Sequence, residues 1–481
     1  MKQTARIRFY STNCLPSYQI LTGIFALVLV FSLFLNPSIP VSAGTSSQET
    51  QNTTFQSFLP ITLASDPAFY VSTRGNDHNP GTFNSPWRTI SKAAQMVEPG
   101  NVVYIRGGIY PESVDFSKSG YSFAPIQILA YPGEIPIIDG NNFNIPAEQG
   151  GALLEISGNY ILVSGLEVRY SSYLGVVITG VHDVADRINA HHNLHGGMNL
   201  NGDYGVIKNS TVWSNDMQNY GGINPAGDST GLTAARHPNF AILSNNVVFG
   251  NWGIGLSTYE SNGTILEDNI VYDNFGPNVY ISDATNVLFQ DNFIYATGSM
   301  ISGGQIGIQT GDEKSNPPSS NITIINNIVY GTTRNLYCLR GSTGKMSNVL
   351  IANNTFINSM DESGIELKAG SYENVNFINN LIQQDGPLPI IRVEDNHPGL
   401  TFSNNLWSKP PRDAASGPGD VIGDPLLMHT GGPFSPIWFM LTDVSPAIGE
   451  AVSLPQVNFD YFGNTREAIP DIGADEFFPT P

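Results

Sequence analysis

Cysteine and basic residues are scarce in this sequence. Only Cys14 and Cys338 occur in 481 residues, so disulfide bonds cannot form the framework of the fold. Lys and Arg together number 21 against 41 Asp and Glu, which gives a net charge of −20. Contacts to nucleic-acid phosphates need clustered Lys and Arg, so we expect no nucleic-acid partner. The fold must be stabilised by its hydrophobic core and by hydrogen bonds.

Motifs of several common enzyme classes are absent as well. The sequence contains no GxSxG nucleophile motif, no phosphate-binding loop and no dinucleotide-binding fingerprint. His191 and His195 form a short HxxxH pair, but such a pair converges on zinc only from a helix, and the surrounding pattern is not helical. We therefore interpret the histidines of this region as core or surface residues.

The N-terminus has the pattern of an export signal. Three basic residues precede an apolar stretch at 20–35, and small residues ending at Ala43 form a plausible cleavage site. Residues 1–43 are therefore predicted to be a signal peptide. A retained membrane anchor is the alternative, although the apolar stretch is short for a bilayer span. Residues 44–65, rich in Ser, Thr and Gln, are predicted to be a flexible leader of a secreted or cell-surface protein.

The most informative feature that is present is a repeat. Ten segments share the order apolar residue, spacer, Asn-rich pair, spacer, apolar residue, as in AILSNNVVF and ITIINNIVY. The steps between them range from 22 to 36 residues, a period typical of a solenoid. With the first residue of each pair as the mark, the copies fall at Gly165, Arg187, Asn209, Asn245, Asp268, Asp291, Asn326, Asn353, Asn379 and Asn404.

The register within the repeat predicts a parallel β-helix. Apolar residues two before and three after each mark form two inward columns, and no helical period is present. Asn and Asp tolerate left-handed backbone angles, so each pair is predicted to bend the chain between two short strands. Stacked Asn amides can then bond along the axis as a ladder. Segments such as GVVIT, GLSTY and NLYCL alternate and add a third strand to each coil; we call their sheet the groove sheet.

Both open ends of a β-helix expose strand edges and need covers. Ile90, Ala93, Ala94 and Val97 recur at helical spacing after Thr89, a candidate N-cap, which predicts an N-terminal capping helix. The predicted fold class is all-β, a solenoid over residues 66–410. Residues 411–481 are irregular and rich in Pro and Gly, and they are predicted to be a C-terminal cap on the last coil.

Two of the repeat steps are long and predict inserted loops. One insertion covers roughly 216–230 and enters the strand GLTAA, and the other enlarges a coil at 302–304 and at 311–320. Both flank the groove sheet. Loops held on a rigid scaffold are where binding usually occurs, so we expect them to wall a groove along the solenoid axis.

A charged residue often ends a strand of the groove sheet. Arg236, Glu260, Asp283 and Arg340 hold this position, and coils stack about 4.8 Å apart, so we expect them to form one row. Such a row can hold a carboxylated or hydroxylated sugar, and a close acid pair can raise one pKa for proton transfer. A solvated charge ladder that stabilises neighbouring coils is the alternative. Arg236, Glu260 and Asp283 are the candidate catalytic residues, and Arg340 is a candidate substrate ligand.

Other side chains near this row are candidates for binding sugar or metal. The candidate substrate ligands on the outer face are Tyr259, Tyr280, Tyr337, Asn199 and Asn201. Tyrosines can stack on sugar rings, although aromatic residues are also ordinary sheet formers. Asp216 and Asp228 of the first insertion offer oxygen ligands suited to Ca²⁺, although loops use Asp for turns just as readily.

The opening FYVSTRGNDHNPGTFNSPWRTISKAAQMVEPGNVVYIRGGIYPESV, the repeats and the SPAIGEA…DIGADEF ending resemble secreted pectate-lyase-like right-handed β-helix proteins. The resemblance covers nearly all of the chain beyond the leader and implies a right-handed parallel β-helix. For the lyases of this group it implies β-elimination, with a Lys or Arg as base and Ca²⁺ or Arg to neutralise the developing enolate. NDMQNYGGINPAGDSTGLTAAR looks like the Asp-containing loop before their reactive strand. Here Ala234 and Ala235 stand where a lysine is expected, and Arg236 is the only basic residue at the strand's end, as the base or as a ligand of the substrate carboxylate.

We therefore expect a secreted, monomeric protein whose partner is a polysaccharide. The leading hypothesis is cleavage of an acidic, uronate-containing glycan by β-elimination in the groove. The alternative is a non-catalytic, adhesive or cell-surface β-helix that binds carbohydrate. A glycoside hydrolase that uses Glu260 and Asp283 is a third hypothesis. The distance between their two carboxyl groups is the observation that tests it. Ca²⁺ is the expected cofactor if Asp216 and Asp228 bind a metal.

Overall fold

The computed structural model describes residues 68–479 except 142–150, 225–228, 299–304, 315–317, 341–344, 362, 396–397 and 413. The predicted signal peptide, the leader and Asp228 lie outside the described residues. Within the described part, no helix is long and apolar enough to cross a membrane.

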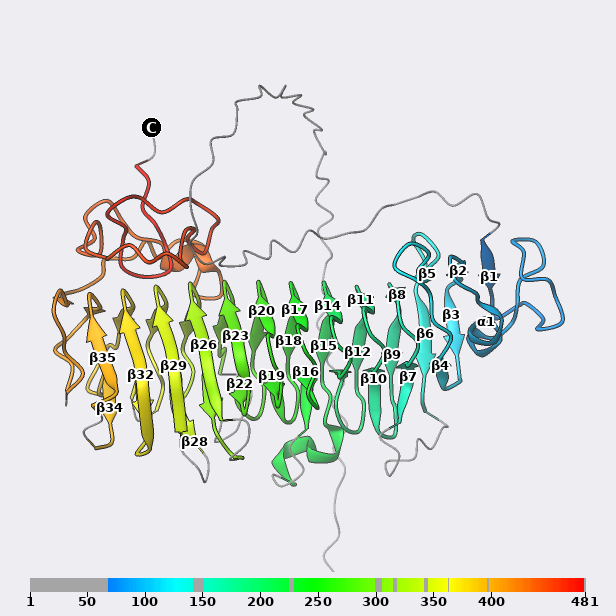
Figure 1. The fold of residues 1–481 in the computed structure, drawn as a ribbon, viewed down its shortest axis with the longest axis horizontal. Helices are drawn as coiled ribbons and strands as arrows, with labels where there is room; N and C mark the ends of the chain where they lie inside the picture. The colour runs from blue at the N-terminus through cyan, green and yellow to red at the C-terminus, as the bar shows by residue number, and fades with distance from the viewer. Residues whose placement is uncertain are drawn as a thin grey trace, which may run out of the picture. The chain divides into compact units, whose positions relative to one another are not determined.

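Three parallel sheets run along the described chain, and each coil except those at the ends contributes one strand to each of them (Figure 1). The sheet that precedes the Asn turn, here the pre-turn sheet, comprises β1 (Phe69–Val71), β2 (Val102–Ile105), β5 (Ile126–Ala130), β8 (Ile161–Ser164), β11 (Val184–Asp186), β14 (Val206–Lys208), β17 (Ile242–Ser244), β20 (Ile265–Glu267), β23 (Thr285–Gln290), β26 (Ser319–Ile325), β29 (Lys345–Ala352), β32 (Ser371–Ile378) and β35 (Leu400–Ser403).

The sheet that follows the turn, here the post-turn sheet, comprises β3 (Gly108–Tyr110), β6 (Pro136–Asp139), β9 (Glu167–Arg169), β12 (Asn189–His191), β15 (Thr211–Trp213), β18 (Val247–Phe249), β21 (Ile270–Tyr272), β24 (Phe293–Tyr295), β27 (Ile328–Tyr330), β30 (Thr355–Ile357), β33 (Leu381–Gln383), β36 (Leu406–Trp407) and β37 (Val421–Ile422). The groove sheet comprises β4 (Val114–Phe116), β7 (Ala152–Ile156), β10 (Leu174–Ile178), β13 (Met198–Leu200), β16 (Thr230–Ala235), β19 (Ile254–Tyr259), β22 (Val279–Ser282), β25 (Ile308–Gly311), β28 (Leu336–Arg340), β31 (Ile365–Leu367) and β34 (Ile391–Val393). The predicted all-β parallel solenoid is confirmed.

The Asn-rich pairs make the predicted turn between the pre-turn and post-turn strands. All ten marks have positive φ, from 51° at Asn353 to 81° at Gly165. Most side chains are disfavoured in this left-handed region, whereas Gly, Asn and Asp tolerate it. The composition of the repeat therefore follows from the backbone angle that each coil requires.

In the last seven of the ten pairs, the second residue is an Asn that builds the predicted ladder. Each amide is fully buried, and each except the last donates from Nδ2 to Oδ1 of the next Asn at 2.9–3.1 Å. The ladder consists of Asn246, Asn269, Asn292, Asn327, Asn354, Asn380 and Asn405. Buried polar groups need partners, and this arrangement supplies them from one coil to the next.

The interior between the three sheets is apolar. The inward columns form one continuous cluster of buried side chains from Val71 to Ala415. Cys338 lies within it at 1% exposure, and burial raises the pKa of its thiol. Cys338 is thus a small apolar core residue, as the repeat register indicates.

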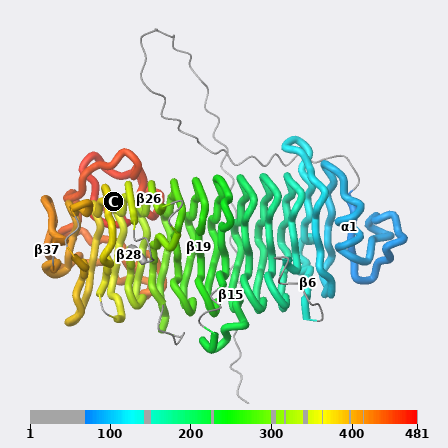
Figure 2. The backbone as a smooth tube through the Cα atoms, turned by 60° about the horizontal axis from the view of Figure 1, so that its bottom comes forward, coloured from blue at the N-terminus to red at the C-terminus, as the bar shows by residue number. Residues whose placement is uncertain are grey.

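The N-terminal cover is the predicted helix, α1 (Ile90–Met96). The Thr89 side chain accepts a hydrogen bond from the Lys92 backbone N–H at 3.0 Å, which is the N-cap contact expected from the sequence. Ile90, Ala93 and Ala94 are buried, and the helix contacts β1 and β4 at the beginning of the solenoid (Figure 2).

The C-terminal segment after β37 is irregular, as predicted, apart from the short 3₁₀ helix η4 (Pro436–Phe439). It packs against the side of several late coils and not on the last coil alone (Figure 1). Its carbonyl groups accept hydrogen bonds from the amides of four marks, namely Asn326, Asn353, Asn379 and Asn404. The same Asn residues therefore turn the chain and hold this cover.

Candidate functional site

A groove of about 490 Å³ lies over the outer face of the groove sheet. Its floor is a row of residues that pair in register on five successive strands: Asn199, Thr233, Ser257, Tyr280 and Gln309. Four coil spacings make this row about 19 Å long. Ser229, Thr230, Ile254 and Pro277 line the groove where the coils enter the sheet, and Ala235, Tyr259 and Glu313 line it where they leave. The hollow is elongated, polar and partly aromatic.

The first inserted loop stands beside this groove, as predicted. It includes the 3₁₀ turn η2 (Met217–Gly222), which projects from the coils near β15 and β16 in Figure 1. The Asp216 carboxylate is fully buried and accepts a hydrogen bond from the Ser229 backbone N–H at 3.0 Å. The Asn219 amide donates to the Trp252 carbonyl at 2.6 Å. The first contact holds the two ends of the loop together, and the second fixes the loop to the next coil, which carries β19.

The contact of Asp216 with the loop also concerns the predicted calcium site. Asp216 stabilises the loop, and its predicted partner Asp228 lies outside the described residues. Among the residues that the structure describes, no three side chains of His, Cys, Asp or Glu converge on one point. The described residues show a structural role for Asp216, and Ca²⁺ binding by Asp216 and Asp228 stays a prediction.

Three of the four residues of the predicted charged row are aligned on neighbouring strands. Ala235, Tyr259 and Ser282 pair in register, so Arg236, Glu260 and Asp283, which follow them, are aligned. All three have positive φ, which places them at the turn that ends each strand. Their side chains therefore leave the plane of the strands and have different surroundings.

Arg340 does not belong to that row, and its predicted place is wrong by one residue. The pairing of β25 with β28 shifts between Gln309 and Gly311, and Gly311 pairs with Arg340. Arg340 is therefore aligned with Ser282, one position before Asp283. A β-bulge of this kind adds one residue to a strand and moves everything after it.

Asp283 is wholly buried. Its carboxylate accepts hydrogen bonds from the Ser282 hydroxyl and from the Lys314 backbone N–H, both at 2.7 Å. It thus holds the second inserted loop against β22. The role of Asp283 as an acid or base stays a prediction, which this burial does not support.

Glu260 is paired with a lysine that the sequence did not single out. The Lys314 ammonium forms an ion pair with Glu260 and lies 5.1 Å from the centroid of the Tyr259 ring. His237 Nε2 is 3.9 Å from the same carboxylate. The hydrogen bond to Glu260, and then that to Tyr259, raises the pKa of Lys314, so this side chain remains a cation. Arg236 is exposed at the same edge of the groove.

Of the other candidate substrate ligands, three line the groove and two lie outside it. Tyr280 is 8% exposed, and its hydroxyl donates to Glu313 Oε1 at 2.6 Å. Tyr280, Tyr259 and Asn199 line the groove. Asn201 and Tyr337 are half-buried outside that lining; the guanidinium of Arg334 lies 5.4 Å from the Tyr337 ring centroid. The roles of all five in sugar binding stay predictions.

The floor row continues beyond the groove into a cationic cluster. Gln309 pairs with Tyr337, Tyr337 with Glu366, and Glu366 with Arg392. Glu366 is 1% exposed and forms an ion pair with Arg334. Its other cationic neighbours are Lys368 at 3.4 Å and Arg392 at 4.0 Å. Lys368 also pairs with Glu394. We call Arg334, Lys368 and Arg392 the basic cluster.

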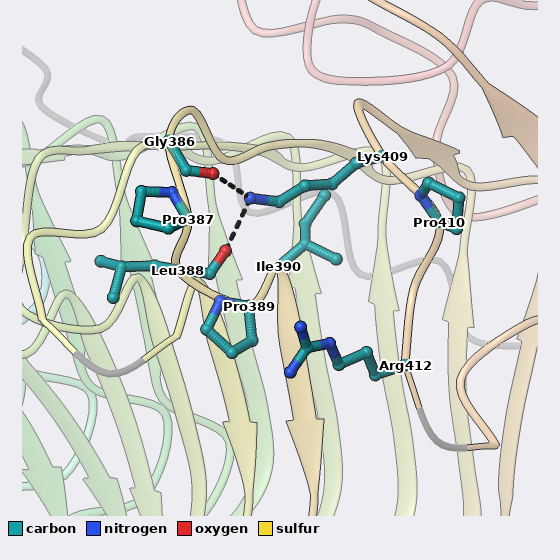
Figure 3. A pocket seen from close by; sticks show the side chains of 8 residues that line it. All are labelled: Gly386, Pro387, Leu388, Pro389, Ile390, Lys409, Pro410 and Arg412. Atoms are coloured by element: carbon teal, nitrogen blue, oxygen red, sulfur yellow. Dashed lines mark hydrogen bonds between the residues drawn. The ribbon is translucent and has the colours of Figure 1, made fainter.

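A second, smaller hollow of about 210 Å³ lies beside the loop before β34 (Figure 3). Pro387, Pro389 and Pro410 contribute to its walls. The Lys409 ammonium donates to the carbonyls of Gly386 and Leu388 at 2.8 and 2.6 Å. That lysine fastens two loops together, so the larger groove is the better candidate for a substrate.

His191 and His195 take part in aromatic packing. The His191 ring stacks on Trp213 with centroids 4.6 Å apart, and burial lowers the pKa of His191. His195 packs edge-on against Tyr173 at 4.4 Å, and burial lowers its pKa as well. Both act as parts of aromatic contacts on the surface of the solenoid.

Known proteins similar to this chain share its fold. The family model described as "Pel9A-like, right handed beta helix region" matches residues 69–205, and the model "Right handed beta helix region" matches residues 151–356. Pectate lyase L of Dickeya dadantii (strain 3937) is 28% identical over 217 residues, 42% of this chain and 46% of that protein. Pectate lyase PEL9 of Emericella nidulans is 30% identical over 161 residues, 31% of this chain and 38% of that protein. These matches span less than half of the relatives' length.

Solved structures agree on the architecture. The crystal structure of pectate lyase Pel9A matches with a TM-score of 0.54 at 19% identity, covering 86% of this chain and 97% of that chain. The structure of XylC with xylose matches with a TM-score of 0.52 at 11% identity, covering 85% and 98%. At such identities the likeness shows the fold alone. Together with the sequence relatives, it shows that the chain is a right-handed β-helix protein related to pectate lyases.

Proposed function

We propose that this protein is a polysaccharide lyase that cleaves a uronate-containing glycan by β-elimination in the groove. The observation that carries the proposal is the groove itself, whose polar and aromatic floor follows the solenoid axis over five strands. An elongated hollow with a few polar groups suits a ligand that is itself a chain. The pectate lyases among the relatives support the reaction class.

The charges near the groove favour an acidic glycan. The whole chain carries a net charge of −20. Cations nevertheless lie along this face: Arg236 is exposed at one edge of the groove, Lys314 beside it pairs with Glu260, and the basic cluster further along the floor row pairs with Glu366 and Glu394. Hydrogen bonds between such cations and carboxylates are charge-assisted and roughly twice as strong as neutral ones. A neutral glycan would gain less from them, because its hydroxyl groups carry no opposite charge.

In β-elimination a base removes the proton α to the uronate carboxyl group. The C–O bond to the leaving sugar then breaks, a C=C bond forms and the leaving oxygen takes up a proton. We assign Lys314 to the uronate carboxylate, where its positive charge stabilises the developing enolate. Arg236 is the proposed base or a second carboxylate ligand, and Glu260 positions Lys314.

One observation favours the alternative, a β-helix that binds carbohydrate without cleaving it. Glu260 is engaged by Lys314, and Asp283 by Ser282 and the Lys314 backbone, so these acids already have structural partners. A hydrolase is less well supported, because two carboxyl groups must face the glycosidic bond and that of Asp283 is buried.

Purified protein incubated with polygalacturonate, alginate and xylan separates these functions. We expect unsaturated uronate products, measured by ultraviolet absorbance, from a uronate glycan and none from xylan. Lys314→Ala and Arg236→Ala should each lower the rate at least about 100-fold, the scale of losing one group that stabilises transition-state charge. Lys118→Ala is the matched control, since Lys118 forms an exposed ion pair with Glu98 near the N-terminal cover.

Other outcomes of this experiment would identify a different function or different residues. New reducing ends without absorbance would identify a hydrolase, and binding without product would identify the non-catalytic alternative. Unchanged rates in both variants would contradict the assigned residues. The same reactions with Ca²⁺ or with a chelator test whether cleavage requires Ca²⁺. Detection of the mature chain in the culture medium, starting at Gly44, tests the proposed secretion.

A further inference from the structure

The side chain of Gln309 is a buried polar group in the floor of the groove. It is 0% exposed, and among the described residues neither its Oε1 nor its Nε2 has a hydrogen-bond partner. A buried amide left in this state costs about 1–3 kcal/mol. Native proteins avoid such groups, so each one needs an explanation.

The position of Gln309 in the groove supplies an explanation. Its side chain lines the groove, and along the floor row it lies between Tyr280 and Tyr337 on the neighbouring strands. The Tyr280 hydroxyl is directed to Glu313 and not to the amide of Gln309. Two tyrosine neighbours keep the local polarity low, which strengthens any hydrogen bond that a ligand makes with the amide.

We propose that Gln309 determines specificity by binding two neighbouring hydroxyl groups of one sugar unit. This inference rests on the proposed function of the groove. The amide presents an acceptor and a donor side by side, and a pair of hydroxyls can donate to the first and accept from the second. A carboxylate has no proton to donate and would leave Oε1 unpaired. In this arrangement Lys314 and the basic cluster bind the carboxylates of different uronate units, while Gln309 binds the hydroxyl edge of one unit.

Gln309→Met removes both hydrogen-bonding atoms and nearly preserves the volume. We expect this variant to bind a polygalacturonate hexasaccharide about 10-fold more weakly by calorimetry, equivalent to about 1.4 kcal/mol. Its melting temperature should not fall, because an apolar group replaces an unsatisfied amide. Gln383→Met is the control; Gln383 lies in β33 of the post-turn sheet, away from the groove, and should leave affinity unchanged.

A second measurement needs no variant. The wild-type protein should bind the hexasaccharide at least about 10-fold more tightly than the same oligosaccharide with acetylated hydroxyls, since acetylation removes the donors. Equal affinity of wild type and Gln309→Met, or of free and acetylated ligand, would overturn the role of Gln309 and leave the lyase proposal intact. If the wild-type protein binds no glycan of the panel, both proposals are wrong.

Discussion

Single buried carboxyl groups make this solenoid sensitive to pH. Asp183 Oδ1 accepts a hydrogen bond from the Ile161 backbone N–H at 2.8 Å, while Oδ2 has no partner among the described residues. Burial raises the pKa of Asp183 to about 8. The folded state then holds a proton that the unfolded chain has released above about pH 4. This group therefore lowers stability progressively as pH rises from about 4 to about 8, by about 1.4 kcal/mol per pH unit.

Asp183→Asn should remove that slope, because the amide keeps the acceptor for Ile161 and cannot ionise. We expect the melting temperature of the variant to exceed that of wild type at pH 8 and to approach it at pH 4.5, measured by calorimetry in matched buffers. Asp443→Asn serves as the control because Asp443 is exposed. Parallel melting curves for wild type and Asp183→Asn across this range would show that Asp183 titrates normally.

The Asn ladder is the element that couples one coil to the next. Asn292 donates to Asn327 Oδ1 at 2.9 Å and accepts from Asn269 Nδ2 at 3.0 Å, and it is fully buried. Asn292→Ala removes these bonds and leaves its neighbours' groups without them. The loss should be about 2–4 kcal/mol of unfolding free energy, since each unsatisfied buried group costs about 1–3 kcal/mol.

Asn376→Ala is the matched control for that ladder variant. Asn376 lies half-buried on the outer surface of β32, where water can replace its bonds, so we expect a loss below about 1 kcal/mol. Denaturant unfolding measures both variants. Equal losses would mean that the ladder adds no more stability than a surface amide.

The sequence allowed the turns, the ladder and the three strands of each coil to be predicted, because each follows from the period and from the backbone preference of Asn. It also located the groove by the two long steps. The sequence could not place Arg340, because one bulge in the pairing with β25 shifts the register. Lys314 was missed because it meets Glu260, 54 residues earlier, only after the inserted loop folds back across the coils. The burial of Asp283 depends on that same loop.

In the described molecule the C-terminal segment completes the outer side of the late coils. Phe293, Ile328 and Leu381 of the post-turn sheet pack against its Leu427, Phe439 and Ile472. The composition of the segment indicated a cap but not the surface that it covers, because its packing partners come from strands far away in the sequence. Without the segment a contiguous apolar surface would face solvent, and such surfaces promote aggregation.

Arg466 holds that segment together, and its removal should release the cover from an intact solenoid. The guanidinium is 4% exposed and pairs with Glu476 at 3.2 Å, and it also donates to Asn326 Oδ1 at 3.0 Å. Arg466→Ala leaves the Glu476 carboxylate buried without its cation, which costs about 3–5 kcal/mol. We expect an additional, lower-temperature unfolding transition and early proteolysis within 424–479, while far-ultraviolet circular dichroism retains the β signal.

Lys118→Ala, at an exposed ion pair, should change stability by less than about 1 kcal/mol. A single transition that includes the loss of the β signal would instead mean that the cover and the coils unfold as one cooperative unit.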